Sequence, residues 1–148
     1  MTPLVALDDR TLVAGQIGPE EVTQAAAAGV SLIVNNRPDG EEPGQPASAE
    51  IERAAADAGL DYRHIPVAGA IAADQVGALC DAMESATGRV LLVCRSGTRS
   101  TFLWAMAACR NGADGESVIA KAAVAGFDVS ALGPFLGGSQ VSGSGPGS

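Results

Sequence analysis

The chain has 148 residues, of which 47% are hydrophobic, and a formal net charge of −8 at pH 7. This length and composition predict one domain with a substantial core, and the acidic charge argues against nucleic acid or an anionic membrane surface as a partner. The first residues lack the basic and long apolar segments of a secretory signal, and no run of eighteen apolar residues occurs. We therefore expect a cytoplasmic protein without a membrane partner.

The order of elements along the chain is the main indication of the fold. Apolar and β-branched runs predict strands at 11–17, 30–35, 62–67 and 90–93. Helical periodicity predicts helices at 19–28, 48–58, 74–85, 100–110 and 117–125, and residues 131–136 could form a short last turn. Ser48 and Asp74 are expected to cap the helices that they begin.

This alternation of strands and helices predicts an α/β fold. We expect a single domain, residues 1–136, with a mostly parallel central sheet of four to five strands flanked by helices. The helix at 100–110 is apolar nearly all round and should be the central buried helix, although Trp104 could instead mark the surface of a homo-oligomer. Residues 137–148 are rich in glycine and serine and are expected to be disordered.

A cysteine follows directly after the last predicted strand. Val90–Val93 runs into Cys94, and the loop Arg95-Ser96-Gly97-Thr98-Arg99 leads to Ser100, where a helix is predicted to begin. Gly97 tolerates the backbone angles that turn the loop amides inward, and the helix adds its positive end. Helix N-termini and neighbouring cations favour the thiolate form of a cysteine. The arrangement therefore predicts that Cys94 is a nucleophile at the carboxyl edge of the sheet, beside a ring of loop amides that binds a small anion.

The residues of this loop have different expected roles. Cys94 and Arg99 are the predicted catalytic pair, because a guanidinium can grip an oxyanion with two hydrogen bonds. The residues expected to bind the anion are Arg95, Ser96, Gly97, Thr98 and Ser100. The alternative is a structural cysteine that ends a core strand, but such a strand end does not need arginine on both sides of a glycine.

Cysteine spacing indicates neither a metal site nor a disulfide framework. The three cysteines are unevenly spaced, which fits a reducing compartment. Cys80 and Cys109 fall on apolar faces of predicted helices and are expected to be core residues; whether either serves Cys94 as a resolving thiol stays open. We expect no metal and no cofactor.

Several segments of the chain resemble known families. The loop from Cys94 to Ser100, with four residues between cysteine and arginine, resembles the active loop of rhodanese-type sulfurtransferases. The segments Ala14–Ile17, Val34–Glu42 and His64–Val67 resemble the phosphatase-like domain of the bacterial beta-lactamase-hydrolase-like family, which is akin to dual-specificity phosphatases. This resemblance spans about residues 4 to 110 and implies a cysteine-phosphatase-like fold. Relatives of the domain occur with persulfide-oxidising metallohydrolase-like partners, so it also implies a role in sulfide or persulfide metabolism.

Two departures from the phosphatase pattern bear on the chemistry. Tyrosine phosphatases have five residues between cysteine and arginine, usually with histidine before the cysteine, whereas here four residues intervene and Val93 precedes Cys94. The shorter loop offers a narrower ring of amides, which fits one sulfur atom better than a phosphoryl group. The segment Ala68–Ile71 stands where dual-specificity phosphatases place an acidic general acid. Without an acid, a factor of roughly 10²–10⁴ in rate is lost for phosphate esters, but a sulfite or thiolate leaving group needs none.

Three residues outside the loop are weaker site candidates. Arg37 begins an acidic loop, residues 37–46; it could reach the site, but pairing with Glu41 or Glu42 is favoured, and the acids indicate a rim or lid. His64 is the only histidine and could act as a general base, although a structural hydrogen bond at a strand end is favoured. Asp74 is the carboxylate nearest to the position of the missing phosphatase acid, although a helix cap is its simpler role.

Three functions follow, all with a small anionic ligand. The favoured hypothesis is a sulfurtransferase in which Cys94 takes sulfane sulfur from thiosulfate or a persulfide, holds it as a persulfide and passes it to an acceptor, with a persulfide-oxidising metallohydrolase as a partner. The alternative is a phosphatase that hydrolyses phosphate esters through a Cys94 phosphoenzyme. The third is a non-catalytic module that binds anions or senses oxidation.

Overall fold

The centre of the structure is a sheet in which the last strand of the sequence lies in the middle. The structure is a computed structural model and describes residues 2–137. The sheet order is β1-β2-β5-β3-β4. Its strands are β1 (Val5–Ala6), β2 (Thr11–Ala14), β3 (Val30–Asn35), β4 (Asp61–His64) and β5 (Arg89–Val93). Only β1 pairs antiparallel, with β2; the other neighbours are parallel. The predicted mostly parallel sheet is confirmed.

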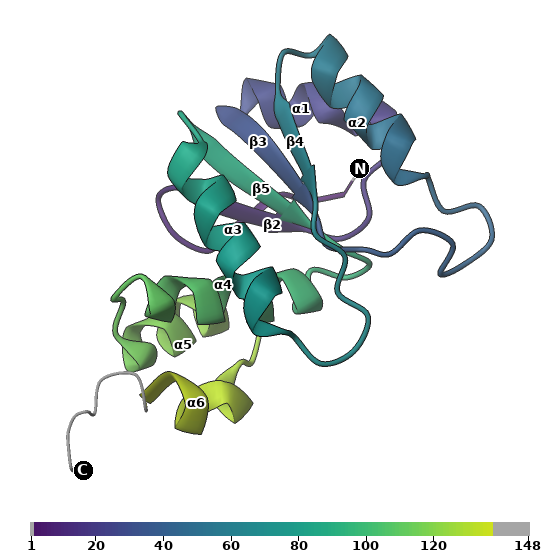
Figure 1. The fold of residues 1–148 in the computed structure, drawn as a ribbon. Coiled ribbons are helices and arrows are strands. Elements are labelled where there is room, and N and C mark those ends of the chain that lie inside the picture. Colours follow the sequence, from purple (N-terminus) through teal and green to yellow (C-terminus); the bar gives the residue numbers. More distant parts are fainter. Residues whose placement is uncertain (1, 138–148) are drawn as a thin grey trace.

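Helices cover both faces of this sheet (Figure 1). On one face lie α1 (Val22–Ala27), which continues the short 3₁₀ helix η1 (Pro19–Glu21), and α2 (Ser48–Asp57). The opposite face carries α3 (Ala73–Ser85), α4 (Thr98–Arg110), α5 (Gly115–Val124) and the C-terminal pair η2 (Ser130–Leu132) and α6 (Gly133–Gly137). The predicted single α/β domain with helices flanking the sheet is therefore confirmed. The expected disordered tail, from residue 138 onward, lies outside the described part of the chain.

Strand β5 is buried on both faces because its side chains alternate between two cores. Leu91 and Val93 pack in the cluster under α1 and α2, whereas Val90 and Leu92 pack in the cluster under α3 and α4. The parallel neighbours β2 and β3 hold its backbone on either side. The residue that follows β5 is therefore fixed at the carboxyl edge of the sheet.

Two predicted strands end earlier than expected: the residues after β2 bond to the loop after β5, and the residues after β4 bond to the end of β3. The amide of Gln16 donates to the carbonyl of Arg95 at 3.2 Å, so residues 15–17 leave the sheet. The amides of Ile65 and Val67 donate to the carbonyls of Asn35 and Asn36, both at 2.9 Å, beyond the end of β4. These bonds join the strand ends at the edge where Cys94 lies.

The predicted caps at Ser48 and Asp74 are wrong by one or two positions. The cap residues are Ala47 and Ala72, whose N–H groups donate to the side chains of Glu50 at 3.2 Å and Gln75 at 2.7 Å. Asp74 is exposed in the first turn of α3. The Ser48 hydroxyl instead contacts the Tyr62 hydroxyl at 2.6 Å.

Helix α4 is the central buried helix, as predicted. Leu103 and Ala105 are fully buried, and Trp104 is only 2% exposed within the chain. The alternative in which Trp104 marks a dimer surface is therefore wrong. No helix among residues 2–137 has the length and apolar character needed to cross a membrane.

The double burial of β5 gives a stability prediction. Leu91→Ala removes a fully buried side chain from the central strand, and we expect it to lower the free energy of unfolding by about 2–5 kcal/mol. The matched control is Val124→Ala on α5, because Val124 is 90% exposed and its loss should change stability little. Urea unfolding of both variants tests this, and equal effects would contradict the described core.

Candidate active site

Cys94 lies directly after β5, beneath the loop that leads into α4. Its side chain is 1% exposed, and the amide of Gly97 donates a hydrogen bond to its sulfur at 3.1 Å. Its own amide faces the Ala14 carbonyl at 3.4 Å. The predicted position at the carboxyl edge of the sheet and the predicted contact between a loop amide and the sulfur are both present.

Gly97 is the residue that lets this loop turn into the helix. Its φ of +91° lies in the left-handed region, and a Cβ at this position would lie 3.0 Å from a ring carbon of Phe127. Both the angle and the crowding require glycine. Gly97 is the cap residue and α4 begins at Thr98, two residues earlier than predicted, so Thr98, Arg99 and Ser100 lie in the first turn, where the helix dipole is positive.

The remaining loop side chains divide between solvent and structure. Arg95 and Ser96 are exposed, and the Ser96 hydroxyl donates to that of Thr98 at 3.1 Å. Ser100 is fully buried, and its hydroxyl donates to Asn36 at 2.8 Å. The hydroxyl of Ser100 therefore fixes the end of β3, which leaves only its amide for the predicted anion binding.

Arg99 connects the cysteine with an acidic loop on the other side. Its two terminal nitrogens form a fork with the Glu41 carboxylate, at 2.7 Å and 2.8 Å, and Nη1 also donates to the Val67 carbonyl at 2.9 Å. Glu41 raises the pKa of Arg99, and the Cys94 sulfur adds a smaller effect in the same direction. The guanidinium thus joins the first turn of α4 to the acidic loop through Glu41.

The loop at 37–46 reaches the site through Glu41 and Glu42, which supports its interpretation as a rim or lid. Arg37 is 2% exposed and contacts both acids, as predicted: Nε lies 2.9 Å from Glu41 and Nη2 lies 3.0 Å from Glu42. A second nitrogen, Nη1, donates to Gln16 at 3.0 Å. Glu42 also lies 3.4 Å from Arg95. We call these five charged side chains, Arg37, Glu41, Glu42, Arg95 and Arg99, the rim cluster.

The other two weak candidates, His64 and Asp74, do not contact the cysteine loop in the described residues. His64 Nε2 lies 2.9 Å from the Arg37 carbonyl, which is the favoured structural role. Asp74 makes no hydrogen bond or ion pair with Cys94 or Arg99 within residues 2–137. The structure therefore does not bring either side chain into contact with Cys94.

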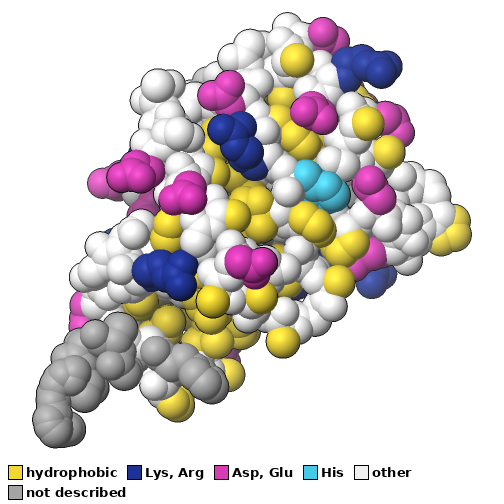
Figure 2. All heavy atoms as spheres, viewed as in Figure 1, with side chains coloured by type: hydrophobic (Ala, Val, Ile, Leu, Met, Phe, Trp, Pro, Cys, Tyr) yellow, Lys and Arg dark blue, Asp and Glu magenta, His cyan; other side chains and the backbone are white. Residues whose placement is uncertain are grey.

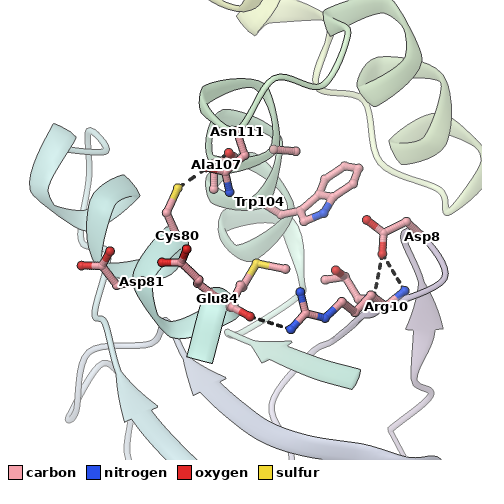
Figure 3. A pocket seen from close by; sticks show the side chains of 11 residues that line it. Asp8, Arg10, Cys80, Asp81, Glu84, Trp104, Ala107 and Asn111 are labelled. Carbon is pink, nitrogen blue, oxygen red and sulfur yellow. Dashed lines mark hydrogen bonds between the residues drawn. The ribbon is translucent and has the colours of Figure 1, made fainter. Parts of the chain in front are cut away.

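The other two cysteines lie away from Cys94, and burial raises the pKa of both thiols. Cys80 faces the Ala107 carbonyl at 3.7 Å and lines a separate pocket of about 530 Å³ between α3 and α4, beside Trp104 (Figure 3). Cys109 lies near the far end of α4, roughly 16 Å along the helix axis from the first turn. Neither cysteine is placed as a resolving thiol in this structure.

An apolar pocket of about 690 Å³ adjoins Arg99. The segment that replaces the phosphatase acid forms one wall, and α4 forms another. Its lining residues are Val67, Gly69, Ala70, Ile71, Thr98, Arg99, Phe102, Met106 and Leu132. Acidic side chains are spread over the molecular face in Figure 2, with basic ones among them. The rim cluster brings three arginines together with two glutamates on a protein with a net charge of −8.

Comparison with known proteins assigns the family. Residues 4–113 match the phosphatase-like domain of beta-lactamase hydrolase-like protein. The chain belongs to this family. The beta-lactamase hydrolase-like protein of Agrobacterium fabrum is 38% identical over 109 residues, which are 73% of this chain and 25% of that protein. The chain thus spans about a quarter of the length of this curated relative, and the predicted resemblance is confirmed.

Solved structures agree with this assignment. A candidate phosphatase from Neisseria meningitidis Z2491 superimposes with a TM-score of 0.79 at 29% identity, over 91% of this chain and 96% of that one. P. aeruginosa TpbA in complex with phosphotyrosine superimposes with a TM-score of 0.59 at 15% identity, over 80% of this chain and 70% of that one. At this identity the likeness shows the fold alone. Family and fold confirm the predicted cysteine-phosphatase-like domain and support the expectation of a cysteine-based enzyme.

The sequence analysis missed the contact between Glu41 and Arg99. The two residues are separated by 58 positions, so no local periodicity connects them. The acids beside Arg37 were a partial signal, because they indicated a loop near the site. The role of Asn36, which accepts from Ser100 and donates to the Ile65 carbonyl, was also not foreseen.

The ion pairs of Glu41 give a pH-dependent prediction. Hydrogen bonds from Arg99 and Arg37 lower the pKa of Glu41 from 4.5 to about 2. A carboxyl group whose pKa falls on folding stabilises the native state above its unfolded pKa, and the contribution is lost as pH falls toward the folded pKa. We expect Glu41→Gln to lower the free energy of unfolding by about 1 kcal/mol at neutral pH, as for a partly exposed ion pair, and this difference to shrink between pH 4.5 and 2.

Urea unfolding at neutral and acidic pH measures this difference. Glu52→Gln is the matched control, because Glu52 is exposed on α2 and its loss makes the same change in charge. A deficit for Glu41→Gln that stayed constant down to pH 2 would contradict the ion pairs as its source.

Proposed function

We propose that this domain hydrolyses phosphate monoesters through a covalent phosphoenzyme on Cys94. The observation that carries the proposal is the hydrogen bond that the Gly97 amide donates to the Cys94 sulfur at 3.1 Å, in a loop that leads directly into the helical turn carrying Arg99. This arrangement lies in a domain of the phosphatase-like family. A fold neighbour is known with bound phosphotyrosine, which supports a phosphate ester as the ligand class.

The two steps of the reaction use the same contacts. In the first step the Cys94 sulfur attacks phosphorus, the bond between phosphorus and the ester oxygen breaks, and the leaving oxygen keeps the electron pair. In the second step water attacks phosphorus and the bond between phosphorus and sulfur breaks. Inorganic phosphate is released and the Cys94 side chain is regenerated. Arg99 and the loop amides offset the negative charge on the phosphoryl oxygens.

The leaving group receives no proton from the carboxylate nearest to Arg99. Glu41 has a pKa of about 2 and is ionised at neutral pH, and the segment Ala68–Ile71 offers apolar side chains only. Esters whose alcohol departs as a stable anion are therefore the better substrates. The apolar pocket beside Arg99 can hold the ring of an aryl phosphate.

Sulfur transfer is the second candidate, and two observations favour it. Four residues separate Cys94 from Arg99, and Cys94 as a whole is 1% exposed, so a single sulfane sulfur is an easier fit than a phosphoryl group. With thiosulfate, the Cys94 sulfur attacks the outer sulfur, the S–S bond breaks and sulfite leaves as an anion. An acceptor thiolate then takes the sulfur. The physiological donor, the metallohydrolase partner and a homo-oligomer stay predictions.

Parallel assays distinguish the two reactions. Wild type, Cys94→Ser and Arg99→Ala are compared for hydrolysis of an aryl phosphate and for sulfur transfer from thiosulfate to cyanide, and intact mass reports a sulfur atom on Cys94. We expect aryl phosphate turnover in the wild type, its loss in Cys94→Ser, and a reduction of roughly 10²-fold or more in Arg99→Ala. Cys80→Ser is the matched control. Sulfur loading without phosphate hydrolysis would reverse the order of the two candidates.

A series of leaving groups tests the missing acid. Without protonation of the leaving oxygen, we expect activated aryl phosphates to react at least ~10²-fold faster than alkyl phosphates. The measurement is kcat/KM across esters whose alcohols differ in pKa. Similar rates for aryl and alkyl esters would show that a general acid operates, and a selective fall for alkyl esters in Asp74→Asn would identify it.

A further inference from the structure

The carboxylate of Glu41 lies where an oxyanion would bind. Oε2 accepts from Nη1 of Arg99 at 2.7 Å, and Oε1 accepts from Nη2 of Arg99 at 2.8 Å and from Nε of Arg37 at 2.9 Å. One oxygen is therefore shared by two guanidinium groups. A planar guanidinium binds the oxygens of phosphate or sulfate with the same fork.

We propose that Arg37 joins Arg99 in binding the oxyanion of the substrate, and that Glu41 occupies this two-arginine site until the anion displaces it. The ligand class is a tetrahedral oxyanion such as a phosphate group. The inference rests on the proposed anion site at Cys94 and Arg99, but it does not require that the bound ester is hydrolysed.

Arg37 has the contacts of a fixed binding residue. Its side chain is 2% exposed, and its Nη2 forms an ion pair with Glu42 at 3.0 Å. A buried guanidinium needs anionic partners, so the loss of Glu41 favours an incoming oxyanion in its place. Its amide donates to the side chain of Asn35, and its Nη1 donates to Gln16. These bonds hold Arg37 in place when Glu41 leaves.

Glu41 lies on a segment that can leave without disturbing the core. No helix or strand forms between Arg37 and Ala47. Within the loop, Gln45 donates to the Pro38 carbonyl at 2.8 Å and accepts from the Glu41 amide at 3.1 Å. The outward movement of residues 38–46 would release Glu41 and Glu42 together, and it would leave Arg37, Arg95 and Arg99 facing the anion.

The exchange of the Glu41 carboxylate for a phosphate group would explain why acidic residues lie over a site that binds anions. With Glu41 bound, the buried charge of Arg37 is compensated. A phosphate dianion has more charge and more acceptor oxygens than a carboxylate, so it can replace Glu41 where a weak monoanion cannot. Glu41 thereby sets the affinity of the site and its selectivity for doubly charged groups.

The test measures binding of inorganic phosphate to the full chain by calorimetry. We expect Glu41→Gln to bind phosphate roughly tenfold more tightly than the wild type, because the competing charge-assisted hydrogen bonds are weakened. Glu52→Gln, the matched control on α2, should bind like the wild type. Arg37→Lys in the Glu41→Gln background should lose most of the gain, since an ammonium cannot form the fork.

Thermal unfolding of each variant shows that the proteins compared are folded. If folded Glu41→Gln binds phosphate no more tightly than the wild type, or if neither binds it, the proposal is wrong. For the aryl phosphate we expect a lower KM in Glu41→Gln, whereas a Glu41 that only positions Arg99 would lower kcat instead. Tighter phosphate binding without turnover in any variant would reject the proposed hydrolysis and leave this inference standing.

Discussion

The position of β5 between two parallel neighbours is the constraint on which the site depends. Burial on both faces and pairing with β2 and β3 fix the point where the chain leaves the sheet, and Cys94 is the next residue. The neighbouring strand ends are joined to this exit, because the Asn36 amide donates to the Val93 carbonyl at 2.7 Å and the Gln16 amide to the Arg95 carbonyl. Core packing far from the sulfur therefore positions the sulfur.

Charge compensation is the second constraint, and it opposes ligand binding. Arg37 is buried, and a buried guanidinium without a counterion is strongly destabilising. Glu41 and Glu42 supply that counterion, and the pairs stabilise the fold. On the proposed exchange these pairs would break when another anion binds. The Glu41 carboxylate would then stabilise the protein and weaken its affinity for the anion at the same time.

The order of the elements and the place of Cys94 could be predicted because both depend on local patterns. Apolar runs mark β3 and β5, and the parallel arrangement follows from the alternation of strands and helices. The start of α4 was misplaced because the left-handed φ of Gly97 ends the loop before Ser100, and the caps were misplaced because Glu50 and Gln75 reach back to the preceding amides. The pairing of Glu41 with Arg99 depends on tertiary structure, which no local pattern encodes.

The nucleophile alone does not separate the two chemistries, because Cys94, the loop amides and Arg99 would serve either one. The two reactions differ in whether the leaving group must be protonated. An alkoxide needs a proton, but the pocket wall at the position of the phosphatase acid consists of apolar residues between Val67 and Ile71. Glu41, the carboxylate that contacts Arg99, stays ionised. Phenolates, sulfite and thiolates leave without a proton. The apolar wall beside Arg99, rather than Cys94 itself, is therefore the feature from which we infer a preference for stable anionic leaving groups.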